Sequence, residues 1–191
     1  MLHLAWIAPL VLLIFFLSSP RYRGDIAESR VRRLLAAGLE RNRYTIFNDF
    51  DLPAGGGTVH FDHVVVSRHG IVVIESQYAR GWVSGTAVQD RWKQQTLGRT
   101  ERFDNPLGRN EQQKLALQAL LGYPPRVIYG IVVMVGQKGF KGELPNHVVE
   151  PEKLIRELRK MGQLLMETEQ AEKAISTIDA TLMSSVGSHI R

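Results

Sequence analysis

The sequence predicts an α/β domain that follows an N-terminal membrane helix and ends in a helical tail. Alternating side chains at residues 58–77 indicate two β-strands, and Arg68, His69 and Gly70 indicate the tight turn between them. A nearly unbroken apolar run at residues 126–136 is typical of a central strand that is covered on both faces. Helical patterns before, between and after these strands complete the α/β order.

Composition limits both the class of protein and the class of partner. With 191 residues, of which 44% are hydrophobic, the chain is long enough for one domain with a substantial core. The net charge of +5 and the isoelectric point of about 9.7 favour an anionic partner, and nucleic acid and anionic lipid head groups fit this charge equally well. The absence of cysteine excludes disulfides, a thiol nucleophile and a cysteine-based zinc site.

Residues 1–19 predict a transmembrane anchor. Every residue from Leu4 to Leu17 is apolar, and the run approaches the roughly 20 residues that a full span needs. Arginines follow this run and do not precede it. The positive-inside rule therefore predicts a single-pass protein of the cytoplasmic membrane whose domain faces the cytoplasm. A cleaved signal peptide and an interfacial or buried helix are the alternatives.

The domain begins with a predicted helix and a predicted strand. Residues 25–41 place apolar side chains on one helical stripe, and Asp25 and Glu28 lie in the first turn, where acids suit the helix dipole. Residues 44–50 predict a strand, and the glycine-containing residues 52–57 predict a loop. The strand pair at residues 58–77 follows directly.

Acidic side chains stand in this otherwise apolar strand pair. Alternation places Asp62 on one face of the first strand together with His60, and places Glu75 and Gln77 on one face of the second. A buried acid costs stability unless it is paired or binds a metal. The histidines have no spacing that indicates zinc, so we interpret them as structural residues.

Residues 82–88 predict a short hairpin with Gly85 in its turn. Beyond it, Trp92 and Phe103 are interleaved with basic residues. This pattern suits stacking on nucleic-acid bases, and it equally suits a solvated rim with two packed aromatic anchors.

A second helix and a helical tail complete the chain. Asn105 and Pro106 are typical of a helix start, and Gly122 is typical of its end. Three elements are predicted after the apolar run, namely a short strand and two helices, at residues 147–149, 150–159 and 166–183.

A series of short segments matches a known protein family in order. The segments are Gly24-Asp25 with Glu28, Phe61-Asp62-His63-Val64-Val65-Val66-Ser67, His69-Gly70-Ile71-Val72-Val73-Ile74-Glu75-Ser76-Gln77, Gly81, Trp92 and Asn105-Pro106-Leu107. Together they resemble the nuclease-related domain called NERD, over about residues 24–122. The resemblance is specific because several spaced segments match in order. It implies a restriction-endonuclease-like fold, in which helices flank a mixed sheet.

The resemblance also implies a division of the chain. The nuclease-like domain is expected at residues 22–136, after the anchor at residues 1–19. Residues 137–191 are expected to form a C-terminal helical extension that packs on the core.

Four catalytic residues are implied by the same resemblance. Asp62 corresponds to the first metal-binding acid, Glu75 to the second, and Glu28 to the acid on the first helix. Gln77 occupies the position of the lysine in the motif of an Asp followed by Asp or Glu, any residue and Lys. A lysine there supplies positive charge, whereas an amide can only form hydrogen bonds and orient. Arg109 stands where the resemblance leads to a glutamine.

The implied activity is hydrolysis of phosphodiester bonds in DNA. Asp62, Glu75 and the Ser76 carbonyl would hold Mg²⁺, or Mn²⁺, through oxygen ligands, and no small-molecule cofactor is expected. Gln77 would position the attacking water, and Arg80 or Lys93 would supply the missing charge.

Two other classes of function remain open. The first is a catalytically degenerate module that binds nucleic acid or another partner while tethered to the membrane, in which the acids pair with basic side chains. The second is a membrane-surface protein whose basic charge serves the lipid interface.

Overall fold

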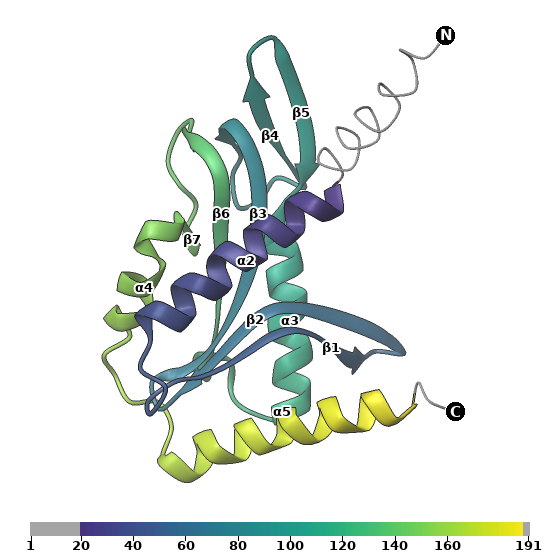
Figure 1. Cartoon of the computed structure of the whole chain (residues 1–191), viewed down its shortest axis with the longest axis vertical. Coiled ribbons are helices and arrows are strands. Elements are labelled where there is room, and N and C mark those ends of the chain that lie inside the picture. The colour runs from purple at the N-terminus through teal and green to yellow at the C-terminus, as the bar shows by residue number, and fades with distance from the viewer. Residues whose placement is uncertain (1–19, 189–191) are drawn as a thin grey trace, which may run out of the picture.

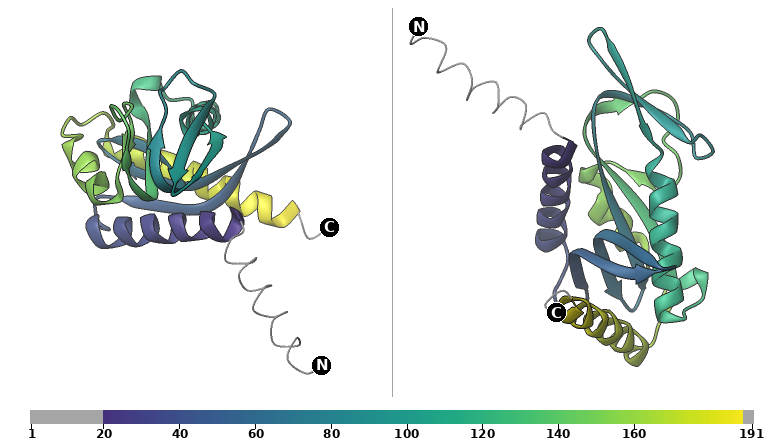
Figure 2. Two further views of the ribbon diagram at one scale, coloured as in Figure 1. Left: turned by 90° about the horizontal axis from the view of Figure 1, so that it is seen from above. Right: turned by 90° about the vertical axis from the view of Figure 1, so that its right-hand side faces the viewer.

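The structure is a computed structural model that describes residues 20–188, in which one seven-stranded sheet is flanked by helices (Figure 1). The elements are α2 (Pro20–Gly38), β1 (Thr45–Ala54), β2 (Gly57–Ser67), β3 (Gly70–Ser84), β4 (Arg91–Thr96), β5 (Arg99–Asp104), α3 (Pro106–Leu121), the 3-10 turn η2 (Pro125–Val127), β6 (Ile128–Phe140), β7 (Val148–Val149), α4 (Pro151–Lys160) and α5 (Thr168–Ser188). Figure 2 shows α2 and α3 on opposite sides of the sheet and α5 across one end.

The sheet is mixed because β6 enters it out of sequence order. Strands β1 to β5 pair consecutively and antiparallel. Strand β6 instead lies parallel to β3, with Ile128 beside Ile71, and β7 lies parallel to β6. The mixed sheet with flanking helices fits the architecture expected from the sequence, and β6 contains residues 128–136 of the apolar run that predicted a central strand.

Strand β3 is long enough to pair with two strands along one edge. Its first residues pair with β2, up to Ile74 beside His63, and its last residues pair with β4, where Val83 lies beside Gln94. Strand β6 occupies the opposite edge. Among the described residues, positions 75–81 of β3 therefore have no neighbouring strand on the edge that β2 and β4 share.

Apolar side chains cover both faces of the sheet. On one face, helices α3 and α5 contribute Leu117 and Ile178 to a cluster that includes Val73 of β3. On the other face, helix α2 contributes Leu35 to a cluster that includes Val72. Burial of both faces explains why β3 and β6 are apolar without alternation in their buried parts.

The second helix is delimited as its sequence predicts. The Asn105 side chain accepts the Leu107 N–H at 3.0 Å, and Pro106 is the first helical residue. Gly122 closes α3 in the left-handed conformation, at φ 69°, and donates its N–H to the Gln118 carbonyl. The Asn105 cap fixes the start of α3, one turn before the side chains that reach the sheet.

Trp92 is an internal anchor of the β4–β5 end of the molecule. Its side chain is fully buried, and its ring packs edge-on against Phe103 and Phe140, with centroid distances of 6.2 and 5.4 Å. Its Nε1–H donates to the Thr86 carbonyl at 2.9 Å. The packed-anchor alternative therefore applies to Trp92.

Two loops differ from the prediction. Strand β1 runs on to Ala54 and β2 begins at Gly57, so the turn between them consists of Gly55 and Gly56, both at positive φ. Residues 82–84 end β3, and the hairpin in this region lies instead between β4 and β5. A Cβ at Gly85 would lie 2.3 Å from the Trp92 ring, so glycine serves close packing there and not a hairpin turn.

The predicted membrane helix and single-pass localisation are contradicted. No helix within residues 20–188 is long and apolar enough to cross a membrane. The physical reason is charge: the long helices α2 and α5 carry acids and bases along their length, among them Arg23, Asp25, Glu28, Arg30, Glu172 and Lys173. The segment named as the anchor, residues 1–19, lies outside the described residues.

Candidate functional site

The candidate site lies at the unpaired edge of β3. Two side chains bond to this edge in place of a strand: Asp62 Oδ2 accepts the Ser76 N–H at 2.6 Å, and Gln94 Oε1 accepts the Arg80 N–H at 2.8 Å. Backbone donors that are withdrawn from water have to be paired. The carboxylate of Asp62 thus helps to hold β2 and β3 at the point where they diverge.

Asp62 is a buried carboxyl group among other charges. Its side chain is 6% exposed. Burial and the neighbouring negative charge of Glu75 raise the pKa of Asp62 to about 7, and the Ser76 N–H and the positive charges of His60 and Arg109 oppose this rise. Such a group is stable as a carboxylate only when a cation or further donors accompany it.

The strand alternation is interrupted next to Asp62. Phe61 packs in the same cluster as Val64 and Val66, and its ring stacks on Phe50 with a centroid distance of 5.1 Å. Strict alternation along the strand would place Phe61 on the face opposite these valines, so β2 departs from alternation at this point. In β1, Asp49 has a positive φ of 52°, which marks a local irregularity of the paired strands.

Glu28 approaches Asp62 and His60 from helix α2. One ligand atom from each of the three side chains lies within 4.8 Å of the other two. Glu28 is partly buried, and its pKa is raised by burial and then by the charges of Asp62 and Asp49. Two carboxylates and an imidazole at this spacing can hold a divalent metal ion.

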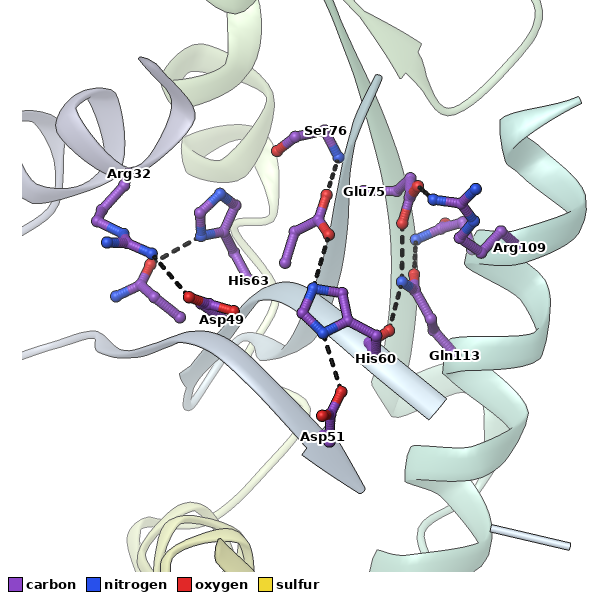
Figure 3. A network of polar contacts seen from close by, with 12 residues as sticks. Arg32, Asp49, Asp51, His60, His63, Glu75, Ser76, Arg109 and Gln113 are labelled. Carbon is purple, nitrogen blue, oxygen red and sulfur yellow. Dashed lines mark hydrogen bonds and ion pairs between the residues drawn. The ribbon is translucent and has the colours of Figure 1, made fainter. Parts of the chain in front are cut away.

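Reasoning from the sequence missed His60. Its Nδ1 lies 2.9 Å from Asp51 Oδ1, and its Nε2 lies 3.6 Å from Asp62 Oδ1 (Figure 3 shows His60 beside Asp51). Burial favours a lower pKa for His60, but the hydrogen bond to Asp51 and the charges of Asp62, Asp51 and Glu28 outweigh it and raise the pKa. The spacing of His60 and Asp62, two residues apart on one strand, was the available clue.

Glu75 is held by helix α3. Its Oε1 lies 2.8 Å from Arg109 Nη1, and its Oε2 accepts from Gln113 Nε2 at 2.8 Å (Figure 3). The side chain of Glu75 is 1% exposed, whereas that of Arg109 is 63% exposed. Burial raises the pKa of Glu75, and Arg109 and Gln113 act against this rise. Glu75 is therefore paired, and is not one of the three groups that converge at Asp62.

Amide side chains connect α3 to both diverging strands. Gln113 Nε2 also donates to the His60 carbonyl at 3.0 Å, and Asn110 Nδ2 donates to the Val73 carbonyl at 3.1 Å. Arg109 and Gln113 are four residues apart on a helix, so both side chains face the sheet from the same side. That spacing was visible in the sequence, but their partner was not.

Gln77 bonds to a neighbouring residue, and the two cations suggested to supply the missing charge, Arg80 and Lys93, lie on β3 and β4. The Gln77 Nε2 donates to the carbonyl of Tyr78, its neighbour on β3, at 2.8 Å. Arg80 lies against Tyr78, with its Nε 3.4 Å from the phenol oxygen, and Lys93 is exposed on β4. Arg109 is the basic side chain that the structure brings to Glu75.

His63 is a buried histidine that follows Asp62 in β2. It is fully buried, and its Nδ1 lies 2.7 Å from Asn48 Oδ1. Burial and then the nearby positive charge of Arg32 lower the pKa of His63 to about 4, against the opposing effect of the Glu28 backbone. Its neutral imidazole thus lies between β1 and the helical turn that carries Glu28.

We expect the fold to lose stability through His63 as the solution is acidified. The pKa of His63 is about 4 in the folded state against 6.5 without the fold, so the unfolded chain binds more protons between these values. This contribution is complete above pH 6.5 and is lost as pH falls toward about 4. The difference between the two pKa values corresponds to about 3 kcal/mol of the free energy of unfolding.

The test compares urea unfolding of wild type and His63→Gln across this range. Asp62 titrates in the opposite sense over overlapping pH values, but it is common to both proteins and cancels in their difference. The free-energy difference should change by about 3 kcal/mol in favour of the variant on acidification. An imidazole resonance of His63 that titrates at its ordinary value, or a difference that is constant with pH, would contradict this expectation.

The chain also matches known proteins. The nuclease-related domain family, NERD, matches residues 23–135, which is more than half of the chain. An uncharacterized protein of Bacillus anthracis is 28% identical over 102 residues, which cover 53% of this chain and 48% of that protein. The chain thus spans about half the length of this relative. No solved structure matches the chain at a significant level.

Proposed function

The chain belongs to the nuclease-related domain family, and from this premise we propose that it hydrolyses phosphodiester bonds in DNA with a divalent metal ion. The observation that carries the proposal is the convergence of Glu28, His60 and Asp62 at the open edge of β3. These side chains come from a helix and a strand that the family match includes. A buried acid beside a second acid is costly for folding, which supports a functional reason for the arrangement.

The residues present fit a divalent ion. The carboxylates of Asp62 and Glu28 offer the oxygen ligands that Mg²⁺ and Mn²⁺ accept, and a cation between them would relieve their repulsion. Glu75 and Ser76 are the other ligands expected from the family resemblance. The Ser76 N–H donates to Asp62, which brings this part of β3 beside it. When bound, the ion polarises the scissile phosphate and activates water.

We assign the positive charge of the site to Arg109. Its guanidinium contacts Glu75 through one nitrogen, and the side chain is 63% exposed, so further N–H donors are available to a phosphate. It can therefore supply the charge that Gln77 lacks. Gln77 retains its expected role of positioning water, for which its amide would have to leave the Tyr78 carbonyl.

DNA is supported as the substrate by basic side chains on the β4–β5 hairpin. The β4–β5 hairpin extends from the core at one end of the molecule (Figure 1). Its exposed basic side chains are Arg91, Lys93, Arg99 and Arg102, of which Arg91 pairs with Asp104 and Arg99 with Glu101. Exposed cations that neutralise phosphates give affinity without sequence preference.

The experiment is a divalent-ion titration of DNA cleavage with the full chain and its Glu75→Ala variant. Cleavage should require the added ion and should fall by about 100-fold or more in the variant, because Arg109, which would supply positive charge at the reacting phosphate, loses the carboxylate that positions it. A chelator control excludes contaminating ions. Equal ion-dependent cleavage by both proteins would show that Glu75 and the Arg109 that it holds are not part of the catalytic site.

A binding module without catalysis is the second candidate function. It is favoured by the pairing of both Glu75 oxygens with Arg109 and Gln113 and by the glutamine at position 77. In that case DNA binding should depend steeply on salt and should persist in Asp62→Ala, while no cleavage occurs with any ion.

A further inference from the structure

The possible metal ligands around Asp62 include the imidazole nitrogen of His60, whereas the family resemblance implied oxygen ligands. We propose that Glu28, His60 and Asp62 bind a divalent first-row transition ion in preference to Mg²⁺, and that Asp51 orients the His60 imidazole for this purpose. The inference rests on the proposed function because it takes this site as the metal site. It is tested by binding, independently of cleavage.

The orientation of His60 is the first argument. A carboxylate at 2.9 Å from Nδ1 is best satisfied when this nitrogen carries the proton, which leaves the lone pair on Nε2. Histidines that bind metals usually donate their other ring N–H to a carboxylate or carbonyl, which fixes the tautomer and strengthens the ligand. Asp51 has this position relative to His60, and it is not itself one of the three converging groups.

The spacing of the ligand atoms is the second argument. His60 Nε2 lies 3.6 Å from Asp62 Oδ1, beyond ordinary hydrogen-bond distance, and in the tautomer that carries the proton on Nδ1 its lone pair faces this carboxylate oxygen. Two ligands that each lie about 2.0–2.2 Å from one ion are separated by roughly 3–4 Å. The third ligand atom, from Glu28, lies within 4.8 Å of both. Small side-chain rotations would bring all three to one ion.

The choice of ion follows from the ligand types. Mg²⁺ prefers oxygen ligands and keeps several waters, whereas imidazole favours transition ions. Glu75, which would have made an all-oxygen site, has its oxygens bonded to Arg109 and Gln113. His60 is therefore the available third ligand. Its side chain is 48% exposed, which leaves an entry path for the ion.

The experiment uses Mn²⁺ as the probe, with the full chain and without DNA. Loss of the electron paramagnetic resonance signal of free Mn²⁺ measures binding, and competition by Mg²⁺ measures preference. Pulsed electron paramagnetic resonance detects coupling of Mn²⁺ to the imidazole nitrogen. Wild type should show this coupling and should prefer Mn²⁺ by at least about tenfold.

The variants separate ligation from folding. His60→Ala should lose the nitrogen coupling and weaken Mn²⁺ binding more than Mg²⁺ binding. Asp51→Asn should keep the coupling but weaken Mn²⁺ binding by about tenfold or more, because the imidazole loses its orienting carboxylate. His69→Ala, in the β2–β3 turn, is the matched control and should bind as wild type does. Circular dichroism confirms that each variant is folded.

The outcomes for this inference and for the proposed function are distinct. Absence of nitrogen coupling in wild type, or equal Mn²⁺ binding by wild type and His60→Ala, would overturn the inference even if Mg²⁺-dependent cleavage occurs. Nitrogen-coupled Mn²⁺ in a protein that cleaves no DNA would support the inference and overturn the proposed function.

Discussion

Replacing Asp62 with asparagine is expected to stabilise the metal-free fold and to reduce ion-dependent cleavage of DNA strongly. The pKa of this carboxyl is raised from 3.8 to about 7 by burial and by Glu75, so the folded state holds the proton more tightly than the unfolded state does. Stability from this group is present in acid and is lost as pH rises through these values. At about pH 8 the carboxylate costs roughly 2–4 kcal/mol, which asparagine avoids.

Asparagine leaves the local geometry available. Its Oδ1 can still accept the Ser76 N–H that Asp62 accepts at 2.6 Å. What it removes is the negative charge that would bind the ion, so cleavage should fall by about 100-fold or more. A simultaneous gain in stability and loss of activity separates a functional acid from a structural one.

Denaturation in chelator at about pH 8 and about pH 4 measures the stability effect. The gain should be present at the higher pH and nearly absent at the lower, where the folded carboxyl is protonated and the unfolded carboxyl, with a pKa of 3.8, is only partly ionised. Asp90→Asn, at an exposed position between β3 and β4, should change the free energy of unfolding by less than about 0.5 kcal/mol. A variant that is less stable than wild type at the higher pH would contradict the assignment of Asp62 as a strained acid.

Replacing Arg109 with methionine is expected to destabilise the fold by about 2 kcal/mol, between the values typical of exposed and buried ion pairs. The change leaves Glu75, which is 1% exposed, with Gln113 as its remaining side-chain partner. Arg109 opposes the rise in the pKa of Glu75, so its loss should raise that pKa further. The destabilisation should therefore be larger at about pH 8 than at about pH 5.

A double-mutant cycle with Glu75→Gln tests the origin of this effect. In the Glu75→Gln background the buried charge is absent, so Arg109→Met should cost much less stability. DNA cleavage should be lost in both single variants. Arg109→Met removes the positive charge, and Glu75→Gln removes the carboxylate that holds it. Equal destabilisation by Arg109→Met in both backgrounds would show that the arginine contributes through packing and not through the ion pair.

Local sequence patterns predicted much of this fold. The β2–β3 pair follows from alternating and β-branched residues with Gly70 in the turn, and α3 follows from its caps at Asn105 and Gly122. The nuclease-related family was identified from the same segments. The extent of β3 was not predicted, because its pairing with β4 is set by tertiary packing around Trp92. Gly85 consequently indicated a turn where the structure uses it for close contact with that ring.

The site was predictable only in part. Asp62 and Glu75 were conspicuous because acids are costly in apolar strands, and Glu28 came from the family resemblance. The contacts of His60 with Asp51 and of Arg109 with Glu75 join different elements, so no pattern along one element reveals them. Whether Glu75 binds an ion or remains paired with α3 depends on these contacts, and its expected role as a metal ligand stays a prediction.

The parallel pairing of β3 with β6 has a consequence for how fast the chain folds. Hairpins such as β1–β2 and β4–β5 join neighbouring segments and close short loops. Pairing of Ile71 with Ile128 instead requires that the β4–β5 hairpin and α3 be brought across before the strands meet. Non-local parallel pairing is intrinsically slow, because the entropy of loop closure is lost before contacts form. Completion of the central strand pair should therefore govern the folding rate, and Glu75 should meet Arg109 only as α3 docks.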